Sequence, residues 1–231
     1  MKEECLICKA LLEYLESDIL MECELCHKKE NSKTRCINAH YVCNDCHTQG
    51  LDSIIGLCIR EESKNPIEII EKIMSMPFCH MHGPEHHVMV GSALLAAYKN
   101  AGGDIDLHSA LIEMMNRGKC VPGGVCGFWG ACGAGISSGI FISIISKSTP
   151  LTNEPFSLSH KMTSKSLGKI GEIGGPRCCK RDSFLSILSA VDFVKEHFSV
   201  EMEKTETVCR FHEQNNQCIK NRCPFFKTNN D

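Results

Sequence analysis

The sequence has no excess of charge of one sign. Its 25 lysines and arginines nearly balance its 28 aspartates and glutamates, so the formal net charge is only −3 at pH 7 over 231 residues. Such a chain has no overall electrostatic field that would attract nucleic acid or an anionic membrane. Composition therefore does not favour nucleic acid as a partner.

A secretory signal is also lacking, because the opening residues MKEEC lead into no apolar run with a cleavage site. A protein that is not exported is not expected to form a disulfide framework. Clustered cysteine and histidine then indicate metal ligands or redox groups. We therefore expect a protein of the reducing cytoplasm.

One charge-free stretch, residues 120–146, is long enough to cross a bilayer. It contains Pro122 and seven glycines, however, and only its second half, AGISSGIFISII, has the composition of a helix. A buried core helix fits this pattern better than a lipid-exposed one. We therefore expect no membrane span.

What the sequence does have is seventeen cysteines, and they are densest in residues 1–50. The ligands there come in four close pairs, and each short spacing lets two side chains from one turn reach the same ion. Four pairs can fill two tetrahedral zinc sites. Because this segment has little apolar periodicity, zinc would supply its folding free energy, about 10 kcal/mol or more per structural ion. The predicted ligands are Cys5, Cys8, Cys23, Cys26, Cys36, His40, Cys43 and Cys46.

Two pairings of these ligands are open. The order of the last two pairs resembles the middle of a RING-type cross-brace, in which alternate pairs share an ion. The cross-brace quartets would be Cys5, Cys8, Cys36 and His40, and Cys23, Cys26, Cys43 and Cys46. Sequential pairing, the first four ligands and then the last four, is the alternative. One pair precedes the usual start of the RING order, so we do not infer ubiquitin ligation.

Three zones follow from the pattern along the chain: a zinc-binding module over residues 1–50, a helical domain over 51–200 and a cysteine-containing tail over 201–231. Strand signals are weak, so the predicted fold is mainly α, with a small zinc-knuckle, cross-brace-like module before the helices. Capping residues, prolines and amphipathic spacing predict the helices. Their expected ranges are 66–76, 84–100, 107–118, 134–146, 159–170 and 181–198.

The segment MHGPEHH, residues 81–87, places several histidines at the start of a predicted helix. The positive end of the helix dipole disfavours imidazolium, so His86 and His87 should be neutral. Neutral imidazole can bind a metal or accept a proton. His82 lies before the helix and can fold back towards it. We expect His86 and His87 to act as metal ligand or general base, and His82 to help bind a cofactor.

Two further helix starts carry cysteine. Cys126 and Cys132 lie in a glycine-rich loop, where close backbone approach suits an inorganic cluster. Cys178 and Cys179 begin another helix beside cations, and both features lower a thiol pKa. Adjacent cysteines diverge, so each can serve a different site. Arg177 and Arg181 would orient an anionic substrate. If the helix starts meet, one pocket collects Cys126, Cys132, Cys178, Cys179, His82, His86 and His87.

The tail contains a fourth group of metal-capable residues, Cys209, His212, Cys218 and Cys223. Cysteine followed by proline, as at Cys223, also occurs where cysteines hold iron–sulfur clusters. The three tail cysteines could form their own zinc site or supply ligands to the central cluster. Both alternatives remain open at the level of sequence.

The motifs MHGPEHH, VPGGVCGFWGACGAGI and GGPRCCKRD together resemble an uncharacterised, cysteine- and histidine-rich family of anaerobic archaea and bacteria. The resemblance spans most of the chain. It implies no settled activity, and some members of that family look fused to methyltransferase-like domains. No glycine-rich nucleotide loop follows a strand here, so we expect no methyltransferase domain in this chain.

These patterns predict a cytoplasmic metalloprotein with structural zinc and a central metal or iron–sulfur site that performs redox or sulfur chemistry. Cys178 and Cys179 would be the reactive or ligating groups. The partner would be a small molecule, anionic or sulfur-containing, or a redox protein. The alternative function is a zinc-binding adaptor without enzymatic activity, which binds protein or nucleic acid through residues 1–50.

Overall fold

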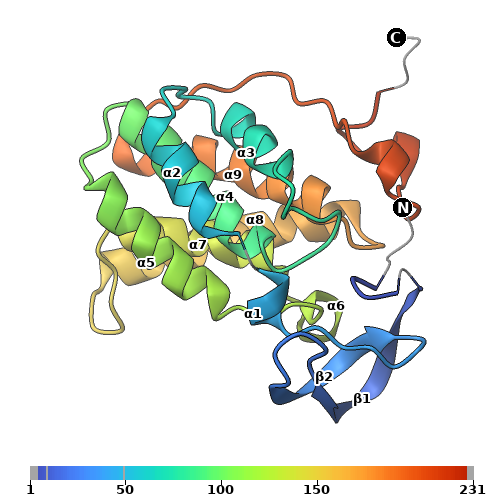
Figure 1. The fold of residues 1–231 in the computed structure, drawn as a ribbon. Coiled ribbons are helices and arrows are strands. Elements are labelled where there is room, and N and C mark those ends of the chain that lie inside the picture. The colour runs from blue at the N-terminus through green and yellow to red at the C-terminus, as the bar shows by residue number, and fades with distance from the viewer. Residues whose placement is uncertain (1–4, 9, 49, 228–231) are drawn as a thin grey trace.

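The computed structural model describes residues 5–8, 10–48 and 50–227, and shows a helical body with a small module beside it (Figure 1). The described part contains nine α-helices and a two-stranded sheet, which confirms the mainly α fold class. The helices are α1 (Asn44–His47), α2 (Asp52–Arg60), α3 (Pro66–Met74), α4 (His86–Asn100), α5 (Leu107–Lys119), α6 (Cys126–Trp129), α7 (Gly133–Ile145), α8 (Glu154–Ile173) and α9 (Cys179–Phe198).

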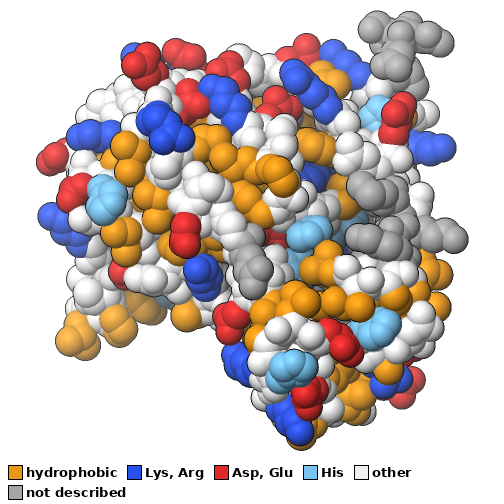
Figure 2. Space-filling view, in the orientation of Figure 1, with side chains coloured by type: hydrophobic (Ala, Val, Ile, Leu, Met, Phe, Trp, Pro, Cys, Tyr) orange, Lys and Arg blue, Asp and Glu red, His pale blue; other side chains and the backbone are white. Residues whose placement is uncertain are grey.

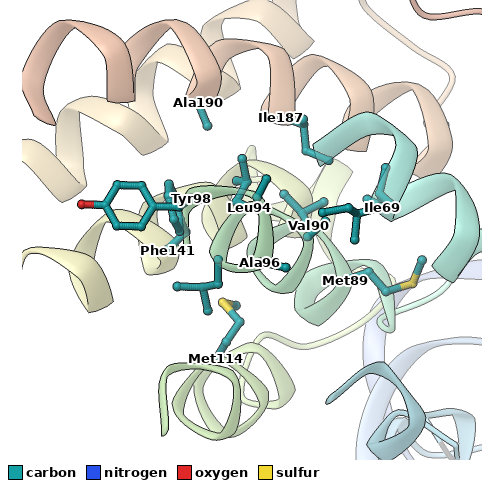
Figure 3. Packing of buried hydrophobic residues seen from close by; sticks show 14 of the residues in the cluster. Ile69, Met89, Val90, Leu94, Ala96, Tyr98, Met114, Phe141, Ile187 and Ala190 are labelled. Atoms are coloured by element: carbon teal, nitrogen blue, oxygen red, sulfur yellow. The ribbon is translucent and has the colours of Figure 1, made fainter. Parts of the chain in front are cut away.

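Helix α4 lies at the centre of the helical body (Figure 1). It contacts α2, α3, α5, α7 and α9, and every residue from His86 to Tyr98 is buried. A helix enclosed on all sides needs apolar or small residues on every face rather than one apolar stripe. Figure 3 shows its side chains among Met114 of α5, Ile187 of α9 and Ile69 of α3. The central position of α4 fixes its first turn inside the protein.

Local signals set the helix starts as predicted. The side chain of Asn65 accepts a hydrogen bond from the N–H of Ile67 at 3.0 Å, and Pro66 occupies the first turn of α3. Asp106 caps α5 by accepting the N–H of Ser109 at 3.5 Å. Helix α8 is longer than the expected range of 159–170, because it begins at Glu154 and ends at Ile173.

The small module is built on a hairpin that the sequence did not reveal. Strand β1 (Leu12–Glu22) pairs antiparallel with β2 (Lys29–Cys36), with an irregularity between Tyr14 and Ile19. Most side chains of β1 stay exposed, so the usual alternation of buried and exposed residues is weak. This hairpin positions the four ligand pairs: one lies before β1, one at the turn, one begins at the last residue of β2 and one follows β2.

After α9 the chain crosses back over the helical body without regular structure (Figure 1). The N–H of Glu203 donates to Lys64 O at 2.9 Å, and the amide of Asn65 donates to Thr205 Oγ1 at 2.7 Å. Phe225 is buried against Phe184 of α9. These contacts hold two short 3-10 turns, η1 (His212–Gln214) and η2 (Lys220–Arg222), beside the start of α9.

Within the described residues, no helix combines the length and the apolar character that a membrane crossing needs. The charge-free segment instead forms α6 and the 13-residue α7. Gly139 of α7 lies so close to α8 that a Cβ there would approach Thr163 Oγ1 to 1.8 Å. The small residues of this segment therefore serve close helix packing, as expected for a core helix.

Candidate metal centres

The first N-terminal quartet consists of Cys5, Cys8, Cys36 and His40, whose ligand atoms all lie within 4.8 Å of one another. The Sγ atoms of Cys8 and Cys36 are 3.4 Å apart, and His40 Nδ1 is 3.2 Å from Cys8 Sγ. A backbone hydrogen bond from Ala10 is the main reason why the pKa of Cys8 falls to about 6. This quartet has the four donors that one tetrahedrally coordinated metal ion needs.

The second quartet consists of Cys23, Cys26, Cys43 and Cys46, again with all sulfur atoms within 4.8 Å of one another. Burial raises the pKa of Cys23, but N–H donors, with Cys43 first among them, outweigh burial and lower this pKa to about 6. Both quartets combine alternate pairs along the chain. The arrangement is therefore that of the cross-brace alternative and not of sequential pairing.

A third group surrounds the start of α4. A cavity of about 30 Å³ is lined by Cys126, Cys132 and Cys179 together with His86 and His87. The cysteines come from α6, from the N-cap of α7 and from the first residue of α9. The helix starts meet as the sequence predicted, and α4 begins at His86. Such a cavity has room for about one water-sized group.

The two imidazoles of α4 have defined tautomers in this cavity. His86 Nδ1–H donates to Gly83 O at 3.0 Å, and His87 Nδ1–H donates to Val121 O at 2.9 Å. Each Nε2 atom then carries the lone pair that binds a metal or accepts a proton. The ring of His87 packs directly on Gly133, where a Cβ would approach Nε2 to 2.2 Å. A side chain at that position would displace the ring.

Burial favours the neutral form of the histidines around the start of α4. Desolvation lowers the pKa of His87 below its ordinary value and lowers that of His86 much further. Desolvation, together with the charge of Arg177, also lowers the pKa of His82 to about 4. The predicted neutral state therefore agrees with the structure, and the loss of solvent is its largest cause.

The adjacent cysteines diverge, and Cys178 belongs to a different pocket from Cys179. It lies with the three tail cysteines around a small, mostly apolar pocket beside η1 and η2. Burial has the largest effect on the pKa of Cys209 and raises it. Negative charge on Cys178, Cys223 and Cys218 raises this pKa further, so the four sulfur atoms lie near one another. The four cysteines are Cys178, Cys209, Cys218 and Cys223.

Hydrogen bonds prepare this four-cysteine pocket for thiolates. The N–H of Phe211 donates to Cys209 Sγ at 3.4 Å, and the N–H of Lys220 donates to Cys218 Sγ at 3.4 Å. The side-chain amide of Asn215 donates to Cys178 Sγ at 3.5 Å. Donors of this kind stabilise sulfur that carries negative charge. The tail cysteines therefore share a site with α9 instead of forming one of their own.

The expectation that Cys178 and Cys179 are free thiolates is wrong. Burial raises the pKa of Cys178 and raises that of Cys179 far above its ordinary value, and the nearby arginines offset only part of this effect. The helix start and the cations lower the thiol pKa as predicted, but desolvation of the charged sulfur raises it by more. Burial therefore favours the protonated form of both thiols.

The two arginines occupy different positions. Arg181 is 3% exposed, donates through Nε to Asp182 Oδ1 at 3.0 Å and bonds Pro176 O, so its guanidinium is held inside the protein and not presented to a substrate as expected. Arg177 lines the cavity of His86 and donates to the hydroxyl of Tyr14. Arg177 thus lines the α4 cavity, where an anionic group could reach it, whereas Arg181 lines the four-cysteine pocket.

Sequence reasoning missed two buried charged residues beside these sites. Glu85 and Lys180 are 0% and 1% exposed. The ammonium of Lys180 donates to Cys79 Sγ at 2.9 Å and to His80 O at 2.8 Å. The glutamate inside MHGPEHH was a readable signal, since a carboxylate among histidines is a common metal ligand. The lysine carried no local signal.

Acidification is expected to destabilise the fold through His82. The unfolded state binds a proton near pH 6.5 and the folded state only near pH 4, so the free energy of unfolding falls as pH drops between these values. The slope from this histidine is about 1.4 kcal/mol per pH unit. Urea denaturation of His82→Gln should show a shallower pH dependence, whereas the exposed control His108→Gln should follow the wild type. Identical slopes for all three would contradict the prediction.

Residues 54–226 match the model of one protein family, which is described as a family of unknown function. The match covers most of the chain and includes the histidine-rich segment, the glycine-rich loop and the adjacent cysteines. The expected resemblance to an uncharacterised family is confirmed to that extent. No curated protein and no solved structure matches the chain.

Proposed function

We propose that this chain, which belongs to the family of unknown function DUF5714, is a redox metalloprotein with structural zinc in its N-terminal module and an iron–sulfur cluster in the four-cysteine pocket. One observation carries the proposal: Cys178 of α9 meets three cysteines that follow it by 31 to 45 residues in the sequence. Cysteine thiolates are the usual ligands of such clusters.

The spacing of the four sulfurs supports a cluster over a single ion. Zinc binds thiolate at about 2.3 Å, so four ligands of one zinc lie within about 4 Å of one another. Among the described residues, the ligand atoms of each N-terminal quartet lie within 4.8 Å of one another, whereas the four sulfurs of the four-cysteine pocket do not. A [4Fe–4S] cluster holds its ligands farther apart because each thiolate binds a different iron. Pro224 after Cys223 fits the same chemistry.

The reaction site in this proposal is the cavity at the start of α4. Cys132 and Cys179 are thiols there, and His87 offers Nε2 as ligand or base. The cavity of about 30 Å³ accepts one reacting atom or small group, not a whole substrate. Arg177 at this cavity suits a small anionic or sulfur-containing substrate. A cluster bound through Cys178, next to Cys179 in the chain, would supply one-electron transfer.

Thiolate metal sites require a reducing environment. All seventeen cysteines are free of disulfides, and eight of the ligand positions lie in the two N-terminal quartets. We therefore place the protein in the cytoplasm. In this proposal residues 1–50 form the zinc-binding module, and the tail 201–231 acts with the helical domain because it shares the cluster site.

A second candidate function, the zinc-binding adaptor, retains one observation in its favour. Phe128 and Trp129 of α6 are 46% and 63% exposed beside the hairpin, and Lys33 Nζ lies 4.8 Å from the centroid of the Phe128 ring. Exposed aromatic and basic side chains together suit a protein or single-stranded nucleic acid partner. Binding of RNA or protein that survives replacement of Cys178 would favour this function.

Metal analysis tests the redox proposal. The full chain is purified without oxygen, and iron, acid-labile sulfide and zinc are counted. We expect iron and sulfide in the 4:4 ratio of a [4Fe–4S] cluster, and dithionite should add one electron and produce an EPR signal. Cys218→Ser should lose iron and sulfide but keep zinc. The control Cys120→Ser, at an exposed cysteine outside every group described above, should keep all three. Zinc without iron and sulfide in the wild type would overturn the proposal.

A further inference from the structure

One buried carboxylate remains unexplained by the sites above. Glu85 is 0% exposed, and its Oε1 accepts the N–H of His80 at 2.9 Å. Its other oxygen, Oε2, is buried and has no hydrogen-bond partner among the described residues. A buried oxygen without a partner costs about 1–3 kcal/mol, and more if it is charged. A missing ligand at this oxygen is a direct explanation.

Two imidazole nitrogens point at the same place. His47 Nδ1 lies 3.4 Å from Glu85 Oε2, and His80 Nδ1 lies 3.6 Å from Oε1. Both nitrogens are buried and have no hydrogen-bond partner in the described part of the chain. The three ligand atoms lie within 4.8 Å of one another. Metal–ligand bonds of about 2.0–2.2 Å bring the ligands of one ion to such separations.

The backbone leaves room for this arrangement. A Cβ at Gly83 would approach Glu85 Oε2 to 2.1 Å and His47 Cε1 to 2.6 Å. Only glycine therefore lets the carboxylate and the ring of His47 sit together. This gives Gly83 of MHGPEHH a role in positioning ligands, beyond the turn that the sequence suggested.

A neighbouring set of ligands is less suitable. Cys79, Glu85 and His86 also lie within 4.8 Å of one another. The ammonium of Lys180, however, lies 2.9 Å from Cys79 Sγ, and an ion at that sulfur would face this positive charge. Lys180 reaches the set of His47, His80 and Glu85 at the backbone oxygen of His80, 2.8 Å away, and not at one of the three ligand atoms.

We propose that His47, His80 and Glu85 bind one divalent transition-metal ion. Two histidines and one carboxylate are ligands of zinc and of non-haem ferrous iron. Three protein ligands leave positions open for water or a substrate oxygen. This site is independent of the cluster, whose ligands are all cysteines.

The proposed metal site lies between the N-terminal module and the helical body. His47 ends α1 of the module, whereas His80 and Glu85 precede α4, so the ion lies where the two parts meet. Figure 2 shows histidine side chains at this junction. His47 and Gly83 also line a cavity of about 540 Å³ between the parts, together with Arg35. The metal would therefore bind at the edge of a cavity large enough for a small organic anion.

Cobalt binding tests this site. The full chain, isolated with its cysteine sites loaded, is dialysed against Co²⁺ alone, and bound cobalt is counted. We expect one added equivalent with weak visible bands and no sulfur-to-cobalt charge-transfer band, because no ligand is a thiolate. Glu85→Gln keeps the shape but removes the charge, and should weaken cobalt binding by more than about 100-fold. The control Glu62→Gln, at an exposed glutamate, should bind as the wild type.

A second variant covers the case in which Glu85→Gln does not fold. The side chain of His80 is 35% exposed, so His80→Asn should fold and also lose the cobalt. Cys218→Ser should keep it, which separates this site from the proposed cluster. No added equivalent in the wild type would overturn the proposal. So would a charge-transfer band for the added cobalt, or wild-type affinity in His80→Asn.

Discussion

Removal of metal from the full chain under reducing conditions is expected to unfold the N-terminal module and to leave the helical body folded. Among the described residues, the buried apolar cluster of the module consists of Met21, Cys23, Tyr41 and Cys43, with three partly buried side chains packed against it. Two of the four buried residues are proposed ligands. This core is too small to hold the hairpin without metal. The loss should be about 10 kcal/mol or more per zinc, the largest effect expected for this protein.

Two measurements check this expectation. A chelator should abolish the slow amide exchange of β1 and β2 and make residues 10–48 sensitive to protease, while the helical circular dichroism changes little. Cys43→Ser should behave like the chelated protein, because it removes one ligand from the second quartet. Cys120→Ser removes an exposed cysteine and should leave the module intact. A protected hairpin in the chelated protein would show that its side chains alone hold it.

Phe141→Ala is expected to destabilise the helical body by about 3–5 kcal/mol. Phe141 of α7 is 0% exposed, and its ring meets that of Tyr98 edge-on, with centroids 5.9 Å apart. Alanine would leave a cavity among α4, α7 and their neighbours, because close-packed helices relax only in part. The loss would be a large share of the stability of a domain of this size.

Urea denaturation of the helical signal measures this loss. Phe156→Ala is the matched control, because the same ring is removed at a position on α8 that is 44% exposed. Its effect should be within about 1 kcal/mol of the wild type, as for most exposed substitutions. Equal destabilisation by the two substitutions would contradict the buried position that the structure gives to Phe141.

The helices of the body were predictable because their signals are local. Pro66 in the first turn of α3 and Asp106 before α5 act within one helical turn, so sequence alone located these starts. The hairpin was not predictable in the same way. Its strands are mostly exposed, and the alternation that identifies a strand depends on one face being buried.

The sequence by itself determined the metal-capable residues, the helix starts that carry them and the mainly α class, since each depends on spacing over a few residues. Only the tertiary structure decided which residues share a site. In the module, alternate ligand pairs share a site. Cys178 lies with the tail cysteines, whereas Cys179 lines the α4 cavity. His47 lies beside Glu85. It also decided the thiol protonation, because burial outweighs nearby cations. Contacts between residues distant in sequence, and the loss of solvent on burial, do not affect the local spacing of residues. These features could therefore be identified only from the tertiary structure.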